Sequence, residues 1–492
     1  MNLAAAAHAE MIRQGFHPDF PATTQTQIDQ VRATAADRLA TPGVTDLRSL
    51  LWSSIDNDTS RDLDQIEWAE RTPQGIRVLI GVADVDAAVG KGSPIDQHAA
   101  DQTTSVYTPA FVFPMLPEEL STDLTSLAEN EDRLAMVVEY TVNTSAPDNE
   151  CDVDGLLLSR KIYRALVNNR AQLAYDSVGN WLEGKSNPPA KVAASPELQA
   201  QLHLQDEAAQ TLHKHRILCG ALEFDRVEAE ADMQENTVQA LKARRKTRAN
   251  DIIEDFMIAA NETMARTLLQ AGRSSIRRVV RTPKRWDRII ALAAEKGTQL
   301  PAQPDSGALD KFLIEQKLAD PVHYPDTSLS VIKLMGPGIY VLTNSKDPDQ
   351  GHFGLAAHDY THSTAPNRRF ADVVTQRIMK AMLANQPPAY SDDELQTLAG
   401  HCTAMEDAAR KVERNTLKMA AALSLATHIG QTYAAVVTGA SDKGTYVRIA
   451  DPPVEGRVMQ GAKGLDVGDE INVKLLHVNP ERGFIDFASL RT

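Results

Sequence analysis

Residues 54–65 read Ser-Ile-Asp-Asn-Asp-Thr-Ser-Arg-Asp-Leu-Asp-Gln, and this acidic stretch is the feature around which the rest of the chain is interpreted. Asp62 and Asp64 alternate across Leu63, so in extended backbone their side chains point to the same side. Carboxylates this close repel one another unless a positive charge lies between them. Hard divalent cations such as Mg²⁺ prefer carboxylate, phosphate and water oxygens. The stretch therefore indicates either a metal site or a solvated acidic turn, and spacing alone does not separate the two.

The segments after the acidic stretch have the periodicities of both strands and helices. Strands are expected at 65–70, 76–85, 134–142 and 155–163. Helices are expected at 165–182, 196–217, 251–270, 371–384 and 392–429. This mixture predicts an α/β body in which the acidic stretch lies beside a sheet that holds it rigidly.

A second dense stretch of chemistry lies at 352–372. Its histidines, His352, His358 and His362, lack a further ligand at clear metal spacing, so hydrogen-bonding or structural roles are favoured over zinc. Arg368 and Arg369 lead into a helix, where guanidinium groups and backbone amides suit a phosphate. The alternative is an arginine paired with Asp372 or another acid.

The ends of the chain differ from the body. Residues 1–45 are alanine-rich and predict two short helices with a linker. Five short strands with Gly or Asp-Pro turns are expected after residue 430, which is typical of an oligonucleotide-binding (OB) barrel. A small β-barrel for protein contacts is the alternative. The fold class is thus α+β multidomain, with a helical segment at 1–45, a mixed α/β domain at 46–428 and a barrel at 430–492.

Composition bounds the class of protein. The 492-residue chain has a net charge of −15, and 42% of its residues are hydrophobic, which is typical of a soluble globular protein. No membrane span and no signal peptide are expected. Cys151, Cys219 and Cys402 are few and far apart, which predicts a reducing cytoplasm, no disulfide and no cysteine metal site. The negative charge argues against nonspecific coating of nucleic acid, though not against an enzyme with basic residues in a channel.

Together these stretches resemble the ribonuclease II/R family of 3′→5′ exoribonucleases, whose catalytic module is the RNB domain. The first family motif is similar to Ile55-Asp56 followed by Asp62-Leu63-Asp64-Gln65. The second is similar to His352-Phe353-Gly354-Leu355 followed by Tyr360 to Asp372. The resemblance covers about 46–428 and extends to the terminal barrel.

The resemblance implies roles for individual residues. Asp56, Asp62 and Asp64 match Mg²⁺-site carboxylates, and Asp64 is also expected to take part in catalysis. Arg368 matches an arginine at the scissile region, and Glu413 matches an acid that completes the site. The expected RNA-binding residues are Tyr107, Tyr175, Phe224, Arg368 and Arg369. The alternative for each aromatic is core packing.

The resemblance also implies a function, with three departures from the family pattern. The expected activity is Mg²⁺-dependent, processive release of 5′-nucleoside monophosphates from single-stranded RNA by a cytoplasmic monomer without a stable protein partner. Gln65 stands where the family has a fourth aspartate, Phe370 where it has tyrosine, and Ala365-Pro366-Asn367 where it has Ser-Pro-Ile. Asp58 is a candidate to compensate for Gln65. The alternatives are a catalytically weakened RNA-binding protein and an unrelated Mg²⁺-dependent phosphatase or DNA nuclease.

Overall fold

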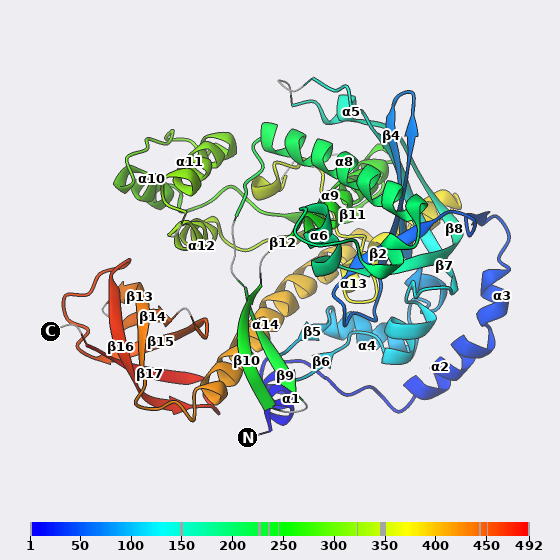
Figure 1. Cartoon of the computed structure of the whole chain (residues 1–492). Coiled ribbons are helices and arrows are strands. Elements are labelled where there is room, and N and C mark those ends of the chain that lie inside the picture. The colour runs from blue at the N-terminus through cyan, green and yellow to red at the C-terminus, as the bar shows by residue number, and fades with distance from the viewer. Residues whose placement is uncertain are drawn as a thin grey trace.

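A computed structural model of the chain describes residues 2–147, 151–224, 228–234, 237–244, 246–321, 323–344, 351–441, 444–449 and 451–490. N-terminal helices, a large α/β body and a small C-terminal barrel follow one another along the chain (Figure 1). This arrangement confirms the predicted α+β multidomain fold with a terminal five-stranded barrel. Among the described helices, none combines the length and hydropathy needed to cross a bilayer.

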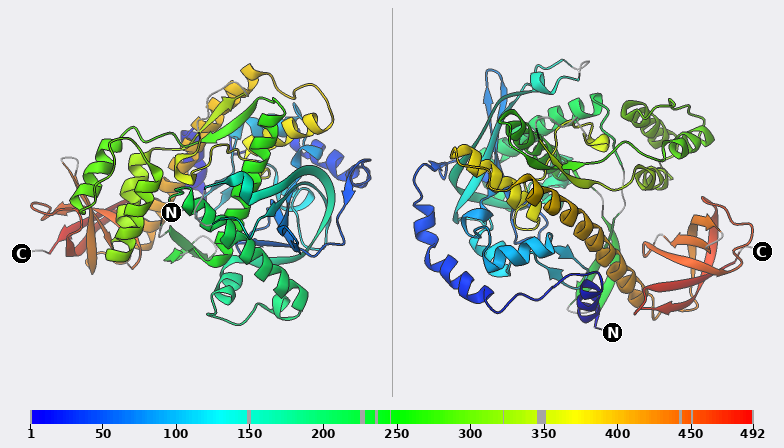
Figure 2. Two further views of the ribbon diagram at one scale, coloured as in Figure 1. Left: turned by 90° about the horizontal axis from the view of Figure 1, so that it is seen from above. Right: turned by 180° about the vertical axis from the view of Figure 1, so that it is seen from behind.

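The body is built on a six-stranded sheet of order β1-β8-β2-β3-β4-β7. Its strands are β1 Thr45–Asp46, β2 Trp52–Asp56, β3 Gln65–Thr72, β4 Gly75–Ala83, β7 Asp132–Val142 and β8 Leu157–Ala174. The long strand β8 pairs antiparallel with β7 and, nearer its end, parallel with β2, so the sheet curls round on itself (Figure 2). β2 ends at Asp56 and β3 begins at Gln65, which places the acidic stretch at one edge of this rigid sheet.

The helix predicted at 165–182 is wrong over its first part. β8 continues as a strand to Ala174, and only α6, Tyr175–Leu182, is helical. Backbone groups between residues 165 and 174 pair with β1, β2 and β7. Pairing with strands that are distant in sequence thus overrides the local helical preference of this alanine- and leucine-containing segment.

Helices cover the sheet and complete the core. The principal ones are α8 Pro196–Leu218, α9 Arg248–Gln270 and α13 Phe370–Leu383. α9 begins with a capping box between Thr247 and Asn250, and its buried face includes Ile252 and Phe256. The smaller elements are η1 Val85–Ala87, α4 Pro94–Gln102, β5 Val106–Tyr107, β6 Val112–Phe113, η2 Leu120–Leu124, α5 Val153–Leu156, α7 Ala190–Ala193, β9 Glu228–Gln234, β10 Thr237–Arg244, β11 Ser275–Val279, α10 Trp286–Glu295, α11 Ser306–Ala319, α12 Tyr324–Met335, β12 Ile339–Thr343 and η3 Phe353–Leu355.

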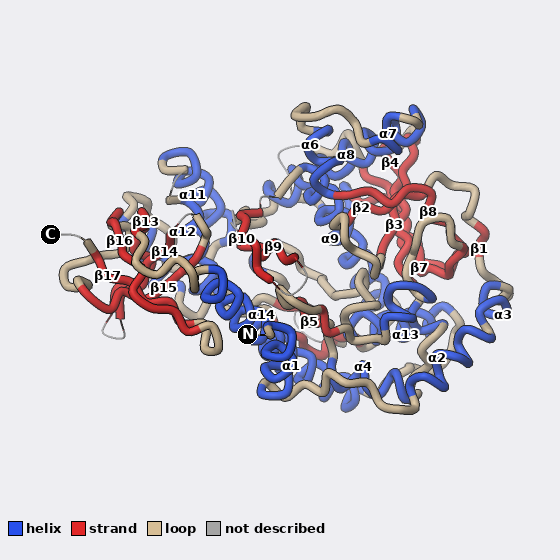
Figure 3. The backbone as a smooth tube through the Cα atoms, turned by 60° about the horizontal axis from the view of Figure 1, so that its bottom comes forward, coloured by secondary structure: helices blue, strands red, loops and turns tan. Residues whose placement is uncertain are grey.

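The long helix α14, Asp392–Ser424, connects the body to the C-terminal barrel (Figures 1 and 2). Its 33 residues span about 50 Å at the rise of an α-helix. The barrel closes in the order β13-β14-β15-β17-β16 and stands apart from the central sheet (Figure 3). Its strands are β13 Thr432–Ser441, β14 Gly444–Ile449, β15 Val454–Gln460, β16 Glu470–Asn479 and β17 Phe484–Ser489. Ala421, Ala422 and Leu425 share the core of the barrel, so the end of α14 is its support.

Three N-terminal helices replace the two that were predicted: α1 Leu3–Arg13, α2 Thr24–Ala33 and α3 Ala35–Leu39. α1 lies against α14, whereas α2 and α3 run along the outside of the body (Figure 1). Asn2 caps α1 by accepting a hydrogen bond from the backbone N–H of Ala5 at 3.0 Å.

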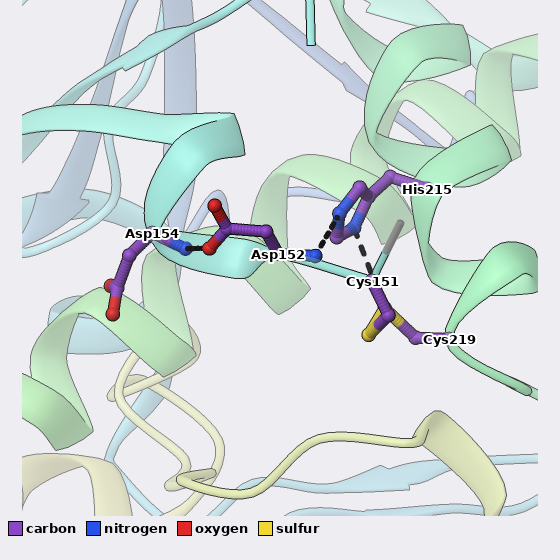
Figure 4. Close-up of a disulfide and its surroundings, with 5 residues drawn as sticks. All are labelled: Cys151, Asp152, Asp154, His215 and Cys219. Carbon is purple, nitrogen blue, oxygen red and sulfur yellow. Dashed lines mark hydrogen bonds between the residues drawn. A yellow bond between two sulfur atoms is a disulfide. The ribbon is translucent and has the colours of Figure 1, made fainter. Parts of the chain in front are cut away.

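A disulfide joins Cys151 and Cys219, so the prediction that the chain has no disulfide is wrong (Figure 4). It ties the connection between β7 and β8 to the end of α8 across a sequence separation of 68. His215 Nε2 accepts the backbone N–H of Asp152 at 3.1 Å, and its Nδ1 lies 3.6 Å from Cys219 Sγ. The two cysteines are far apart in sequence but meet because the segment before β8 passes over the end of α8. Cys402 is a buried free thiol on α14.

Candidate active site

Asp64 is the most enclosed carboxylate of the acidic stretch. Its side chain is 1% exposed, and Oδ1 accepts the backbone N–H of Asn367 at 2.8 Å. Oδ2 lies 3.2 Å from Nε of Arg368 and forms an ion pair with it, but it is buried without a hydrogen bond. Burial raises the pKa of Asp64 to about 7, although Arg368 and the Asn367 N–H favour its charged form. An additional cation beside Oδ2 would stabilise the ionised carboxylate.

Asp62 and Tyr107 connect the acidic stretch to the short strand β5. The Tyr107 hydroxyl donates to Oδ2 of Asp62 at 2.9 Å, and Tyr107 as a whole residue is 41% exposed. Asp56, at the end of β2, accepts the backbone N–H of Asn57 at 2.7 Å and the hydroxyl of Ser60 at 2.8 Å, both through Oδ1. These contacts fix the orientation of both carboxylates.

Glu413 enters the site from α14. Its Oε1 accepts the backbone N–H of Tyr107 at 3.3 Å, so this acid lies next to the residue that contacts Asp62. Burial raises the pKa of Glu413, although the Tyr107 N–H and Arg410 stabilise the charge. Residues from β5, α14 and the acidic loop therefore meet at one place, as the resemblance implies.

The two arginines before α13 have different surroundings. Burial alone would lower the pKa of Arg368, but Asp64, Tyr107 and the other aspartates raise it above its ordinary value. Its side chain remains 39% exposed and is free to meet a ligand. Arg369 instead donates from Nε and Nη2 to the buried Asp372, both at 2.8 Å. Asp372 also accepts the backbone N–H of Ala365, so this pair stiffens the turn that carries Arg368. A role for Arg369 in RNA binding stays a prediction.

The remaining predicted aromatics are placed elsewhere. Tyr175 begins α6 and packs, partly buried, against the main core. Phe224 packs, partly buried, against the separate core formed by α10, α11 and α12. The contacts described above therefore bring together Asp62, Tyr107 and Glu413, and join Asp64 to Arg368, but they do not include Tyr175 or Phe224. The RNA-binding roles of these two aromatics stay predictions.

The fit of the site to Mg²⁺ is mixed. In the described part of the chain, no group of three or more His, Cys, Asp or Glu side chains is arranged to hold a metal ion. The chemistry of the donors nevertheless suits a hard cation, because Asp64 has a buried oxygen without a hydrogen bond and Asp62 is near enough to raise the pKa of Asp64. Mg²⁺ commonly uses only one or two protein carboxylates and takes water and phosphate oxygens as its other ligands. Asp62 and Asp64 fit that pattern, with Asp56 as a further candidate.

The departures from the family pattern have distinct environments. Gln65 is buried at the start of β3, whereas Asp58 is exposed in the loop. Phe370 is buried, so the ring of this residue serves the core without needing a hydroxyl. Asn367 is fully buried, and its Oδ1 accepts the hydroxyl of Thr125 at 2.6 Å.

Sequence reasoning missed the positioning groups around the carboxylates. Asn367 supports Asp64 through its backbone N–H, and Ser60 supports Asp56 through its hydroxyl. The turn-forming Ala365-Pro366-Asn367 was a signal for the first, because a turn presents backbone N–H groups. His362 has the hydrogen-bonding environment that was predicted for it: its Nδ1 lies 2.7 Å from the Tyr340 hydroxyl, and burial lowers the pKa of His362 well below its ordinary value.

The fold and the site together define an α+β multidomain protein with an aspartate–arginine–tyrosine cluster on its body and an OB-type barrel at its end. The chain belongs to the RNB family: the RNB domain matches residues 44–385, and the RNase II-type exonuclease C-terminal S1 domain matches residues 431–490. The family resemblance inferred from the two motifs is therefore confirmed.

Curated relatives and solved structures agree with this assignment. Ribonuclease R of Thermotoga maritima is 28% identical over 483 residues, covering 90% of this chain and 64% of the relative. Ribonuclease R of Escherichia coli is 28% identical over 486 residues, covering 91% of this chain and 58% of the relative. The chain thus spans about three fifths of the length of these relatives. Mycoplasma genitalium RNase R in complex with ribose methylated single-stranded RNA has a TM-score of 0.86 at 22% identity, covering 99% of this chain and 78% of that one.

Proposed function

We propose that the chain is a Mg²⁺-dependent exoribonuclease that degrades single-stranded RNA processively from its 3′ end and releases 5′-nucleoside monophosphates. The observation that carries the proposal is the meeting of Asp62, Tyr107 and Glu413 beside the Asp64–Arg368 pair. Carboxylates, an accessible guanidinium and an exposed aromatic ring are the groups needed to hold a phosphodiester beside a stacked base. Relatives named ribonuclease R support RNA as the substrate class.

Each side chain of the cluster has a definite task in this proposal. Mg²⁺ bound at Asp62 and Asp64 would polarise the phosphate and activate water. Arg368 donates to the phosphate oxygens and offsets the negative charge that grows as the phosphorus is attacked. Tyr107, whose hydroxyl is fixed on Asp62, offers its ring to a base near the 3′ end. Arg369 holds the turn of Arg368 in place through Asp372.

The second candidate is an RNA-binding protein whose RNB domain has weak activity or none. Gln65 favours it, because a neutral amide oxygen binds Mg²⁺ less strongly than a carboxylate. The arrangement of the described carboxylates, without a group of three, points the same way. Yeast Ssd1, a pseudonuclease, has a TM-score of 0.70 at 18% identity, covering 96% of this chain and 57% of that one.

A single assay separates the candidates. End-labelled poly(A) RNA and its DNA counterpart are incubated with the chain in Mg²⁺ or in EDTA, and the products are resolved by length. The proposal expects mononucleotides from RNA only, with none in EDTA. Tight binding of RNA without products would overturn it in favour of the binding protein, and equal digestion of DNA would remove the RNA specificity. A monomeric state and a cytoplasmic location stay predictions.

A further inference from the structure

We propose that helix α1 is a positioning element of the active site, which holds Tyr107 and Glu413 in register with Asp62. The inference rests on the proposed function, because it assigns a role in that reaction to the N-terminal segment. α1 lies alongside α14 near the short hairpin β5–β6 (Figure 2). It therefore touches the two elements that bring Tyr107 and Glu413 to the acidic stretch.

The apolar face of α1 packs against the immediate neighbours of both site residues. Ala7 and Met11 of α1, with Phe16 just after it, form one buried cluster with Val106 and Val412. Val106 precedes Tyr107, and Val412 precedes Glu413. The same cluster contains Phe113, which pairs with Val106 across β5 and β6. Because close-packed interiors transmit small displacements, a change of volume at Met11 shifts both backbones.

A polar contact fixes α1 along the axis of α14. Glu10 is fully buried, and its Oε1 accepts the side-chain amide of Asn415 at 2.9 Å and that of Gln14 at 2.8 Å. Arg13 pairs with the same carboxylate and offsets its charge. Asn415 lies two residues after Glu413 on α14. Gln14 and Arg13 move with α1, so the contact with Asn415 is the one that sets the position of the two helices. Sliding α1 along α14 would break that contact and cost a buried carboxylate one of its hydrogen bonds.

The geometry gives these contacts a consequence for the reaction. The backbone N–H of Tyr107 reaches Glu413 at 3.3 Å, and the Tyr107 hydroxyl reaches Asp62 at 2.9 Å. The first distance joins β5 to α14, which is the junction that α1 covers, and the second depends on where that junction places β5 relative to the acidic stretch. α1 thus acts through Val106 and Val412 without touching the reacting atoms itself.

The test compares substitutions on the two faces of α1 in the full chain. Met11→Ala removes buried volume, whereas Ile12→Ala changes a neighbouring side chain that is 56% exposed. We expect Met11→Ala to lower kcat roughly 10- to 100-fold with KM for RNA little changed, since small misplacements of reacting groups carry that cost. Ile12→Ala should match the wild type, and Met11→Leu should restore most of the rate because it conserves volume.

Amide hydrogen exchange of the segment that contains Tyr107 supplies a readout independent of turnover. Exchange there should quicken in Met11→Ala but not in Ile12→Ala. If Met11→Ala does not fold, kcat and exchange are measured in Asn415→Ala instead. That substitution keeps a good helix former on α14 and removes only the contact with Glu10. An inactive wild type would overturn the proposed function, while the exchange data would still show whether α1 positions Tyr107. Unchanged kcat and unchanged exchange in the folded Met11→Ala or Asn415→Ala protein would overturn the role of α1.

Discussion

At the scale of single residues, the Asp64 carboxylate lacks the full set of hydrogen bonds and positive neighbours that a buried negative charge needs. It is nearly enclosed, its Oδ2 lacks a hydrogen bond, and burial raises its pKa to about 7. Arg368 offsets the negative charge from one side only, and its own side chain is partly exposed. A carboxylate in this state is suited to gain a further positive ligand, which is why the metal proposal centres on Asp64.

Asp64→Asn is expected to abolish turnover while leaving RNA affinity within about 3-fold of the wild type. The amide removes a charged ligand from the proposed metal site, a loss of roughly 100-fold or more in kcat, but it touches none of the predicted base contacts. Initial rates and filter binding on the same RNA measure the two effects. Asp37→Asn is the matched control, because Asp37 is an exposed aspartate on α3, outside the acidic stretch, and should keep its rate. Unchanged turnover in Asp64→Asn would mean that the metal assignment is wrong.

Glu262 on α9 predicts a pH dependence of stability away from the site. Burial raises its pKa from an ordinary 4.5 to about 7, although Arg266 and Arg216 favour the charge. A raised carboxyl pKa means that folding favours the protonated form. The free energy of unfolding is therefore highest below pH 4.5 on this account and falls as pH rises through about 7, by on the order of 3 kcal/mol. Urea unfolding at pH 5 and pH 8 should show this loss in the wild type and a smaller one in Glu262→Gln. Equal losses in both proteins would remove Glu262 as the cause.

The residues of the site were predictable where the motif is local, and not where contacts are distant. The spacing of Asp62 and Asp64 indicated that they share a side, and Arg368 was predicted at the start of a helix. The contact of Asp64 with Asn367 joins positions 303 apart, and that of Tyr107 with Glu413 joins positions 306 apart. No local pattern encodes such pairs, so only the resemblance connected them. Arg369 and Asp372 are only three positions apart, and their ion pair was stated as the alternative to phosphate binding by an arginine at this helix start.

At the scale of elements, long amphipathic helices and barrel strands were predicted well, because each depends on its own periodicity. The segment at 165–174 was not, since its strand conformation depends on β1, β2 and β7. The prediction that the chain has no disulfide failed for a similar reason. Cys151 lies before β8 and Cys219 ends α8, and their spacing of 68 residues matches no simple cysteine motif.

The disulfide makes a prediction about these two elements. Alkylation of the denatured, unreduced protein should modify Cys402 alone, and prior reduction should expose all three thiols. Replacing both cysteines with serine should lower the free energy of unfolding by about 4 kcal/mol, because a closed loop of this length restricts the unfolded chain. Mass spectrometry and urea unfolding measure the two effects. Three modified thiols before reduction, in protein purified without reductant, would show that the bond does not form.

At the scale of the whole molecule, the barrel and the body are joined by one continuous helix. α14 carries Glu413 into the site and ends in the core of the barrel through Ala421 and Leu425. A single rigid connection limits the separation between the two parts, so on the proposed function an RNA long enough to reach both would gain affinity from each. Short RNA would then engage the body alone.

Tyr446→Ala tests this division of labour. Tyr446 lies on β14 of the barrel and is 37% exposed, as expected of a ring that stacks on a base. The substitution should weaken binding of long RNA by about 1–3 kcal/mol, the usual cost of losing one stacked base, and leave tetranucleotide binding unchanged. Val467→Ala, at an exposed position of the barrel, is the control. Equal affinity of wild type and Tyr446→Ala for long RNA would remove Tyr446 from the RNA path.

The wide spread of the site along the chain has a consequence during synthesis. Asp64 needs the backbone of Asn367, and Tyr107 needs Glu413, each about 300 positions later. At bacterial to eukaryotic elongation rates of 5–20 residues per second, the acidic stretch emerges from the ribosome roughly 15–60 seconds before its partners. On the proposed function, a nascent chain is therefore inert toward the message that encodes it. On that function, the order of the segments delays nuclease activity until Glu413 has been synthesised and has folded against Tyr107.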